Sequence, residues 1–140
     1  MKSQRKSGEN VPMEHVEQVT YVNWHERTFP NVLIFAIPNG GLRNIQVALK
    51  LQAEGEKPGV PDLFVPEWRL FIEMKRRKGG RWRQEQKEMM EELERIGYTC
   101  LVGNGWEDAV KKVLHFLEST GRMHLTDQRI ALTHCGDAGT

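Results

Sequence analysis

The chain has 140 residues, of which 39% are hydrophobic and 28% charged, a composition that predicts one globular domain and excludes a disordered chain. Twenty basic and 19 acidic residues give a formal net charge of +1, so a nucleic-acid partner would have to be bound by locally clustered charge. No apolar run approaches the roughly 20 residues of a membrane span, the first ten residues lack the apolar segment of a secretory signal, and two cysteines fit a reduced, cytoplasmic setting.

The first half of the chain is predicted to alternate between helices and short strands. The elements are a flexible start over residues 1–11, a helix over 13–24, a strand over 32–37, a helix over 43–54 closed by a glycine, and two strands over 60–65 and 69–75. Apolar residues at helical spacing (Val16, Val19 and Val22) indicate the first helix, and Phe29-Pro30-Asn31 ends it. The two last strands are joined by a tight turn at Pro66-Glu67-Trp68.

The second half is predicted to hold two amphipathic helices around one strand. A basic, glycine-containing loop over 76–83 leads to a helix over 84–96, a strand over 98–102, a turn over 103–105 and a last helix over 106–117. The pattern decays beyond Ser119, so residues 119–140 are predicted to be a poorly ordered tail. This order predicts an α/β domain over 12–118, with a mixed sheet of about four strands flanked by helices.

Two acids and a lysine lie on the two strands that are joined by the tight turn. Asp62 opens the first strand, and Glu73 and Lys75 share one face of the second, whereas Leu70, Ile72 and Met74 share the other. Asp62 and Glu73 could be ordinary surface acids, since Pro-Asp is a common turn dipeptide. Charges at the end of an apolar strand are costly without a partner, however, and a divalent cation would offset that cost. The arrangement predicts a site for Mg²⁺ or Mn²⁺ and a phosphate, as in phosphodiester cleavage.

Five short motifs, in order along residues 13–118, give the chain a family resemblance. They are Glu14-His15-Val16-Glu17-Gln18, Ile37-Pro38-Asn39-Gly40-Gly41, Gly59-Val60-Pro61-Asp62-Leu63, Glu73-Met74-Lys75 and Gln84-Glu85-Gln86. The acids and the lysine resemble the signature of the PD-(D/E)XK nucleases. The whole set resembles the virus-type replication-repair nuclease (VRR-NUC) domain, especially its compact stand-alone forms in phages and bacteria. The resemblance implies a PD-(D/E)XK core, a metal-dependent endodeoxyribonuclease and a cytoplasmic location in a bacterial or phage-infected cell.

The same resemblance implies one more acid from the first helix and a glutamine from the helix after the lysine. At about 100° per residue, Gln86 lies on the stripe that faces the sheet and Gln84 does not, so Gln86 is our choice. On the first helix the predicted apolar arc is centred near Val16 and Val19, which favours Glu17 over Glu14, although Glu14 remains open as the alternative.

Each candidate then has a chemical role. Asp62, Glu73, the backbone carbonyl of Met74 and Glu17 are expected to hold the cation. Lys75 is expected to position the attacking water or to neutralise charge on the phosphate, and Gln86 to orient Lys75 or the water; Gln86 could instead be a polar residue of the helix start.

The DNA-binding surface is predicted to combine the basic loop with the turn after the first strand. Its members are Asn39, Gly40, Gly41, Arg76, Arg77, Lys78, Arg81, Trp82 and Arg83. Basic side chains would contact phosphates, and Trp82 would stack on an unpaired base or cap the core. The alternative is that the loop is only a solvated loop.

The resemblance implies, as the favoured activity, resolution of four-way (Holliday) junctions. Such a junction needs paired cuts in two strands, and a C2 homodimer with two sites would supply them. The last helix (Val110, Val113, Leu114, Leu117) or the Ile34-Phe35 region could form the interface, or could belong to the core. The alternatives are a flap- or nick-processing or restriction-type nuclease with the same site, and an inactive DNA-binding module. All five histidines are expected to lie on the surface or in the tail rather than to bind metal.

Overall fold

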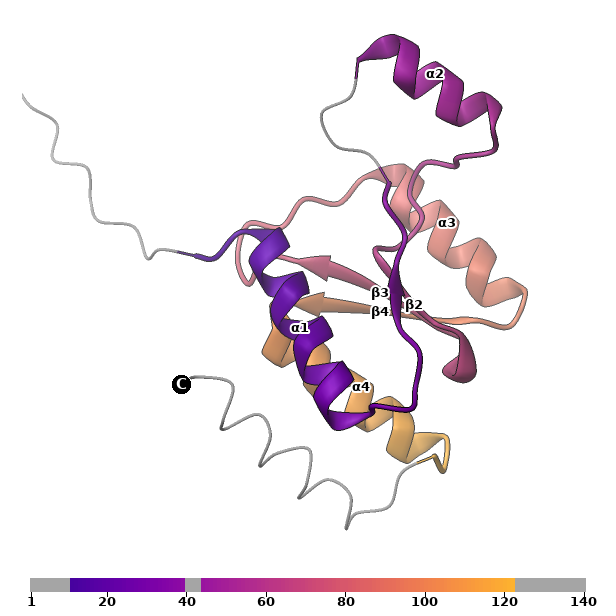
Figure 1. The fold of residues 1–140 in the computed structure, drawn as a ribbon. Coiled ribbons are helices and arrows are strands. Elements are labelled where there is room, and N and C mark those ends of the chain that lie inside the picture. The colour runs from indigo at the N-terminus through magenta and orange to yellow at the C-terminus, as the bar shows by residue number, and fades with distance from the viewer. Residues whose placement is uncertain (1–10, 40–43, 123–140) are drawn as a thin grey trace, which may run out of the picture.

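The computed structural model describes residues 11–39 and 44–122, and these form four α-helices and one four-stranded sheet (Figure 1). The predicted start over residues 1–11 and the tail over 119–140 lie almost entirely outside the described residues, as do Gly40 and Gly41. Among the described residues, no helix is long and apolar enough to cross a membrane.

The sheet is mixed, with the strand order β1-β2-β3-β4. Strands β1 (Phe35–Ala36), β2 (Leu63–Val65) and β3 (Leu70–Lys75) pair antiparallel, and β4 (Thr99–Asn104) runs parallel to β3. A 3₁₀ turn, η1 (Pro66–Trp68), joins β2 to β3, with Arg69 at a positive φ of 50°. The predicted α/β class and the mixed sheet of four strands are confirmed.

The predicted alternation along β3 places its apolar and charged side chains on opposite faces. Leu70, Ile72 and Met74 are buried in the main core, under α1 (Glu14–Thr28) and α4 (Trp106–Ser119). Glu73 and Lys75 point to the other face, where α3 (Gln84–Arg95) begins. α1 and α4 therefore cover one face of the sheet, and the other face carries the charged pair.

Helix α1 buries a different face from the predicted one. Val16 and Val19 are exposed, whereas Tyr21, Trp24 and His25 are buried against the sheet and α4. Two aromatic rings outweigh two valines in apolar area, and together they set the face that turns inward. His25, expected on the surface, is also buried, and one of its ring nitrogens lies 3.0 Å from the Val32 carbonyl.

Strand β1 and the segment before α4 also differ from the prediction. The strand predicted over 32–37 is only two residues long in the structure, and its partner β2 has only three residues with which it can pair. The turn expected over 103–105 is mostly strand, since parallel pairing with β3 continues as far as Lys75 opposite Asn104. Gly103 is required there, because a Cβ atom at this position would lie 2.5 Å from the Ala109 side chain.

Three further features concern α2, α4 and the outer edge of the sheet. The helix predicted over 43–54 is α2 (Ile45–Ala53), capped by the Asn44 side chain and drawn apart from the sheet in Figure 1. The last helix packs into the core, so Val110, Val113, Leu114 and Leu117 are not available as a dimer interface. At the outer edge of β4, the ammonium of Lys112 donates to the Val102 carbonyl at 2.6 Å.

Candidate active site

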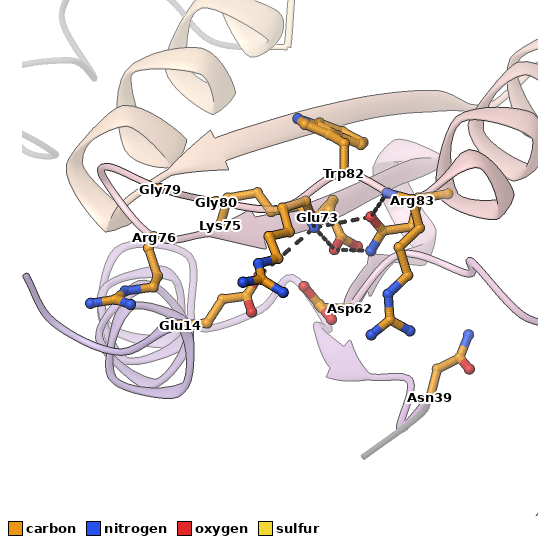
Figure 2. A pocket seen from close by; sticks show the side chains of 12 residues that line it. Glu14, Asn39, Asp62, Glu73, Lys75, Arg76, Gly79, Gly80, Trp82 and Arg83 are labelled. Carbon is orange, nitrogen blue, oxygen red and sulfur yellow. Dashed lines mark hydrogen bonds and ion pairs between the residues drawn. The ribbon is translucent and has the colours of Figure 1, made fainter. Parts of the chain in front are cut away.

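A polar cavity of about 760 Å³ opens where β2, β3, α1 and α3 meet (Figure 2). Its walls are formed by Glu14, Asn39, Asp62, Glu73, Lys75, Arg76, Gly79, Gly80, Arg81, Trp82, Arg83 and Gln86. Residues from five separate stretches of the chain therefore converge on one cavity.

The two acids are brought together by the antiparallel register of β2 and β3. Leu63 pairs with Ile72, so Asp62, one residue earlier, lies beside Glu73, one residue later. The Met74 N–H donates to Asp62 Oδ2 at 2.8 Å, which fixes the carboxylate at the end of β3. The side chain of Met74 itself is buried in the core.

Lys75 is the centre of the hydrogen-bond network in the cavity. Its buried ammonium donates to the Arg81 carbonyl at 2.6 Å and to Gln86 Oε1 at 3.0 Å, and it lies 3.3 Å from Glu73 Oε1. The ring of Trp82 lies 5.0 Å from the same nitrogen, within the range of a cation–π contact. These partners hold the charge of Lys75 inside the cavity, next to the acids.

Gln86 bridges the lysine and the acid with both ends of its amide. Its Oε1 accepts from Lys75 and from the Arg83 N–H, and its Nε2 donates to Glu73 Oε1 at 2.9 Å. Two donors on the oxygen leave the amide nitrogen facing the carboxylate. Gln84 instead points away and donates to Glu88, so the glutamine on the predicted sheet-facing stripe is the one that reaches the cavity.

The loop before Asp62 packs directly on the start of α3. Gly59 has a φ of +83°, and a Cβ atom at this position would overlap the Glu85 carbonyl. Only glycine combines that backbone conformation with so close an approach. This contact holds the segment that carries Asp62 against the helix that carries Gln86.

Burial makes the acids of the cavity hard to ionise. Burial, and then the nearby charge of Asp62, raises the pKa of Glu73 to about 7, against the opposing effect of Lys75. The pKa of Asp62 is also raised, mainly by burial, although the hydrogen bond from Met74 opposes the change. A positive charge added between the two acids would lower the pKa of both.

The two candidate acids of α1 occupy different places. Glu14 lies on the wall of the cavity, with its half-exposed carboxylate 3.9 Å from the ammonium of Lys75. Glu17 is 1% exposed and turned away from the cavity, toward the start of α4. There it accepts from the Trp106 N–H and from Arg77 Nε at 3.1 Å. The geometry therefore puts Glu14, rather than Glu17, beside Asp62 and Glu73.

Most of the predicted DNA-binding residues that the structure describes line the cavity. Arg81, Trp82, Arg83 and Asn39 line the cavity, and so do Gly79 and Gly80, which the sequence did not single out. Arg76 also lines it, while donating to the carbonyls of Val11 and Pro12.

Two basic residues of the loop are not part of the cavity wall. Arg77 pairs with Glu17 and reaches Glu107 at 3.9 Å, so its guanidinium stabilises the junction of α1 and α4. Lys78 is exposed outside the cavity wall, and Gly40 and Gly41 lie outside the described residues.

The donor set of the cavity fits a hard divalent cation held partly by solvent. Within residues 11–39 and 44–122, no three acidic, histidine or cysteine side chains are gathered closely enough to enclose a metal ion by themselves. Mg²⁺, however, is usually bound by one or two carboxylates together with waters and substrate phosphates. Asp62 and Glu73 supply such a pair, with Glu14 within reach of the same cavity.

Comparison with known proteins supports the fold. No protein-family model matches the sequence, and no curated protein matches it. The structure is similar to a solved structure described as "VRR_NUC domain protein", with a TM-score of 0.63, 25% sequence identity and coverage of 77% of this chain and 90% of that one. The chain therefore has the VRR-NUC fold, which is a fold of the PD-(D/E)XK type, and the resemblance noted from the sequence is confirmed at this level.

Proposed function

We propose that this chain, which has the VRR-NUC fold, is a divalent-metal-dependent DNA endonuclease that hydrolyses phosphodiester bonds. The observation that carries the proposal is the convergence of Asp62, Glu73 and Lys75 in one polar cavity, at the positions that the PD-(D/E)XK signature assigns to its catalytic residues. The similarity to a VRR_NUC domain protein supports a nuclease.

Asp62 and Glu73 would hold Mg²⁺ or Mn²⁺ in this cavity, together with the Met74 carbonyl and an acid of α1. The position of Glu14 on the wall makes it the better candidate for that acid than Glu17. When bound, such a cation would polarise the phosphoryl oxygen and lower the pKa of the attacking water.

Lys75 and Gln86 would act on the phosphate and on the orientation of the site. The ammonium of Lys75 is fixed by the Arg81 carbonyl and by Gln86, so it needs little reorganisation to neutralise charge that develops on the phosphate. Gln86 holds Glu73 with its other end, and thus keeps the lysine and the acid in one geometry.

DNA would approach across the rim formed by the basic loop. Arg81 and Arg83 are exposed at the cavity and would contact backbone phosphates. The ring of Trp82 is partly exposed beside Lys75 and would stack on a base that is unstacked next to the scissile phosphate. Such bases occur at branch points and flaps, so the rim favours branched DNA.

The favoured activity is resolution of four-way junctions by a homodimer. One chain carries one such cavity in its described residues, whereas a junction requires symmetric cuts in two strands. A C2 pair of chains would provide them.

Cleavage of labelled four-way junction, flap, nicked and linear duplex DNA with Mg²⁺ or Mn²⁺ tests the proposal. Glu73→Ala and Lys75→Ala should abolish cutting, while Glu91→Ala and Lys111→Ala, at exposed positions outside the cavity, should not. Paired symmetric cuts in the junction would support a resolvase, and cutting of flaps alone would reject it while keeping the nuclease. If no substrate is cut with either metal, the nuclease proposal fails, and the inactive DNA-binding module becomes the better candidate.

A further inference from the structure

The ammonium of Lys75 is enclosed, and each of its hydrogen-bond donors already faces an oxygen. The side chain is 4% exposed, and an ammonium carries three N–H groups. Three oxygens lie close to the nitrogen: the Arg81 carbonyl at 2.6 Å, Gln86 Oε1 at 3.0 Å and Glu73 Oε1 at 3.3 Å. A phosphate oxygen can therefore bond to Lys75 only after one of these three partners has left.

The Arg81 carbonyl is the partner of Lys75 that is most easily withdrawn. Glu73 lies on β3 and Gln86 on α3, whereas Arg81 belongs to an exposed loop without helix or strand. The next residue, Trp82, is 41% exposed, and its ring lies 5.0 Å from the ammonium (Figure 2). The carbonyl and the ring together cover the lysine from the side of this loop.

The base of the loop is anchored by two arginines. Arg76 donates to two carbonyls of the segment before α1, and Arg77 donates to the buried carboxylate of Glu17. Gly79, which follows, has a φ of +75°, and a Cβ atom built there would have nothing within 4 Å among the described residues except its chain neighbours. Glycine in this conformation, with free space around it, lets the chain pivot. The loop tip, which we define as residues 79–82, can therefore move while the base stays fixed.

DNA with an unstacked base offers a replacement for both contacts between the loop tip and Lys75. A base that stacks on the ring of Trp82 competes with the cation–π contact, and such stacking is at least as strong as a cation–π contact at an exposed site. A phosphate in the cavity can replace the Arg81 carbonyl as the acceptor for Lys75, because a charged acceptor forms the stronger hydrogen bond. Linear duplex supplies the phosphate but no free base, so it replaces only one of the two contacts.

We propose that the loop tip is a gate on Lys75, which DNA with an unstacked base opens and linear duplex leaves closed. This role rests on the nuclease function proposed above, and it makes Trp82 and the Arg81 carbonyl determinants of substrate choice. The ammonium stays beside Gln86 throughout. Only one acceptor changes, since a phosphate oxygen takes the place of the Arg81 carbonyl. A lysine that is covered until branched DNA arrives would keep the enzyme from cutting intact duplex.

Limited acetylation of the full chain without DNA, followed by mass spectrometry of its peptides, measures how well the tip covers Lys75. Trp82→Ala removes the ring, and Gly80→Val pushes the tip away, since a Cβ atom at position 80 would already lie 3.1 Å from the Cβ of Lys75. Both variants should raise the labelling rate of Lys75, relative to exposed Lys111, by about tenfold, the factor expected for one lost contact of this kind. Arg83→Ala, which removes a basic side chain of the same cavity and keeps the cover, should leave the rate unchanged. Urea unfolding shows whether each variant keeps the fold.

Cleavage of a flap and of linear duplex at saturating DNA, with Mg²⁺ or Mn²⁺, tests whether this cover acts as a gate. Trp82→Ala and Gly80→Val should both cut linear duplex about tenfold faster than the wild type, because Lys75 is uncovered without a base. A ring that only binds DNA would give no such gain. Arg83→Ala should weaken binding of both substrates alike, because it removes a contact to phosphate.

The labelling and the cleavage fail in different ways. Labelling of wild-type Lys75 as fast as Lys111, or labelling that neither variant changes, would overturn the cover. Duplex cutting that stays constant or falls in both variants would overturn the gate. If the wild type cuts no DNA, the nuclease function fails, and the labelling rates still decide whether the tip covers Lys75.

Discussion

Replacing the buried acid Glu73 with glutamine should change how the stability of the metal-free protein depends on pH. The Glu73 side chain is 3% exposed, and burial, followed by the charge of Asp62, raises its pKa from 4.5 to about 7. At pH values between these two pKa values, Glu73 keeps its proton in the folded chain and has lost it in the unfolded chain. The wild-type protein is therefore destabilised as the pH rises from about 4.5 to about 7.

The size of the effect follows from the two pKa values. Each pH unit between them corresponds to about 1.4 kcal/mol, so full ionisation of Glu73 costs the folded state about 3 kcal/mol. Between about pH 5 and about pH 8 the unfolding free energy of the Glu73→Gln variant should rise relative to the wild type by about 2 to 3 kcal/mol. The comparison with the variant is needed because the lowered pKa of buried His25 acts in the opposite sense, stabilising the fold as the pH rises.

Urea unfolding in the presence of a chelator, followed by tryptophan fluorescence at the two pH values, measures this difference. Glu91→Gln, at an exposed position on α3, is the control and should show no pH-dependent difference from the wild type. A gap that stays constant, or that widens toward low pH, would refute the reasoning, because Glu73 would then be ionised as an ordinary acid paired with Lys75. Saturating Mg²⁺ or Mn²⁺ near pH 8 should stabilise the wild type and leave the variant unaffected.

Three further predictions follow from the contacts around the cavity. Glu14→Ala should lower metal-dependent cleavage with little effect on stability. Glu17→Ala should instead lower the free energy of unfolding by about 2 kcal/mol, because it removes a buried carboxylate that caps α4. Activity assays and urea unfolding of the two variants distinguish these roles. Gln86→Ala should lower kcat by about 10- to 100-fold with a much smaller change in KM, because it orients groups rather than binds DNA, and an unchanged kcat would argue for a role in helix capping alone. Trp82→Ala should weaken binding of flap or junction DNA, measured in Ca²⁺, by about 1 to 3 kcal/mol relative to linear duplex, and Trp82→Phe should restore it.

The parts of the site that could be predicted from the sequence are those set by short-range geometry. Asp62 directly precedes β2, Glu73 lies on β3, and only residues 66–69 join the two strands, so the proximity of the acids follows from the register of a tight hairpin. Gln86 could be chosen over Gln84 because helical periodicity is reliable over one or two turns. The strict alternation of side chains along a strand predicted which residues of β3 face the core and which face the cavity.

The parts that could not be predicted depend on partners far away in the chain. The buried face of α1 is set by Tyr21 and Trp24 rather than by the valines that dominate the apolar pattern. The same stripe runs through Glu17 and Glu14, so periodicity could have placed both acids on the inward face. The choice between them depends on position along the helix, because Glu17 meets the start of α4 whereas Glu14, one turn earlier, reaches the cavity wall. The role of Arg77 was likewise hidden, since its partner Glu17 lies 60 residues earlier in the chain.

The lysine at the outer edge of β4 limits how molecules of this protein can associate. A sheet with an open edge can grow by accepting a strand from a neighbouring molecule. Here the Lys112 ammonium donates to the Val102 carbonyl at one edge, so that carbonyl is already hydrogen-bonded. The opposite edge strand, β1, has only two residues with which a further strand could pair. Continuous sheets across molecules are thus discouraged on both sides, which guards a concentrated protein against fibrous aggregation and leaves contacts between side chains as the route to an ordered assembly.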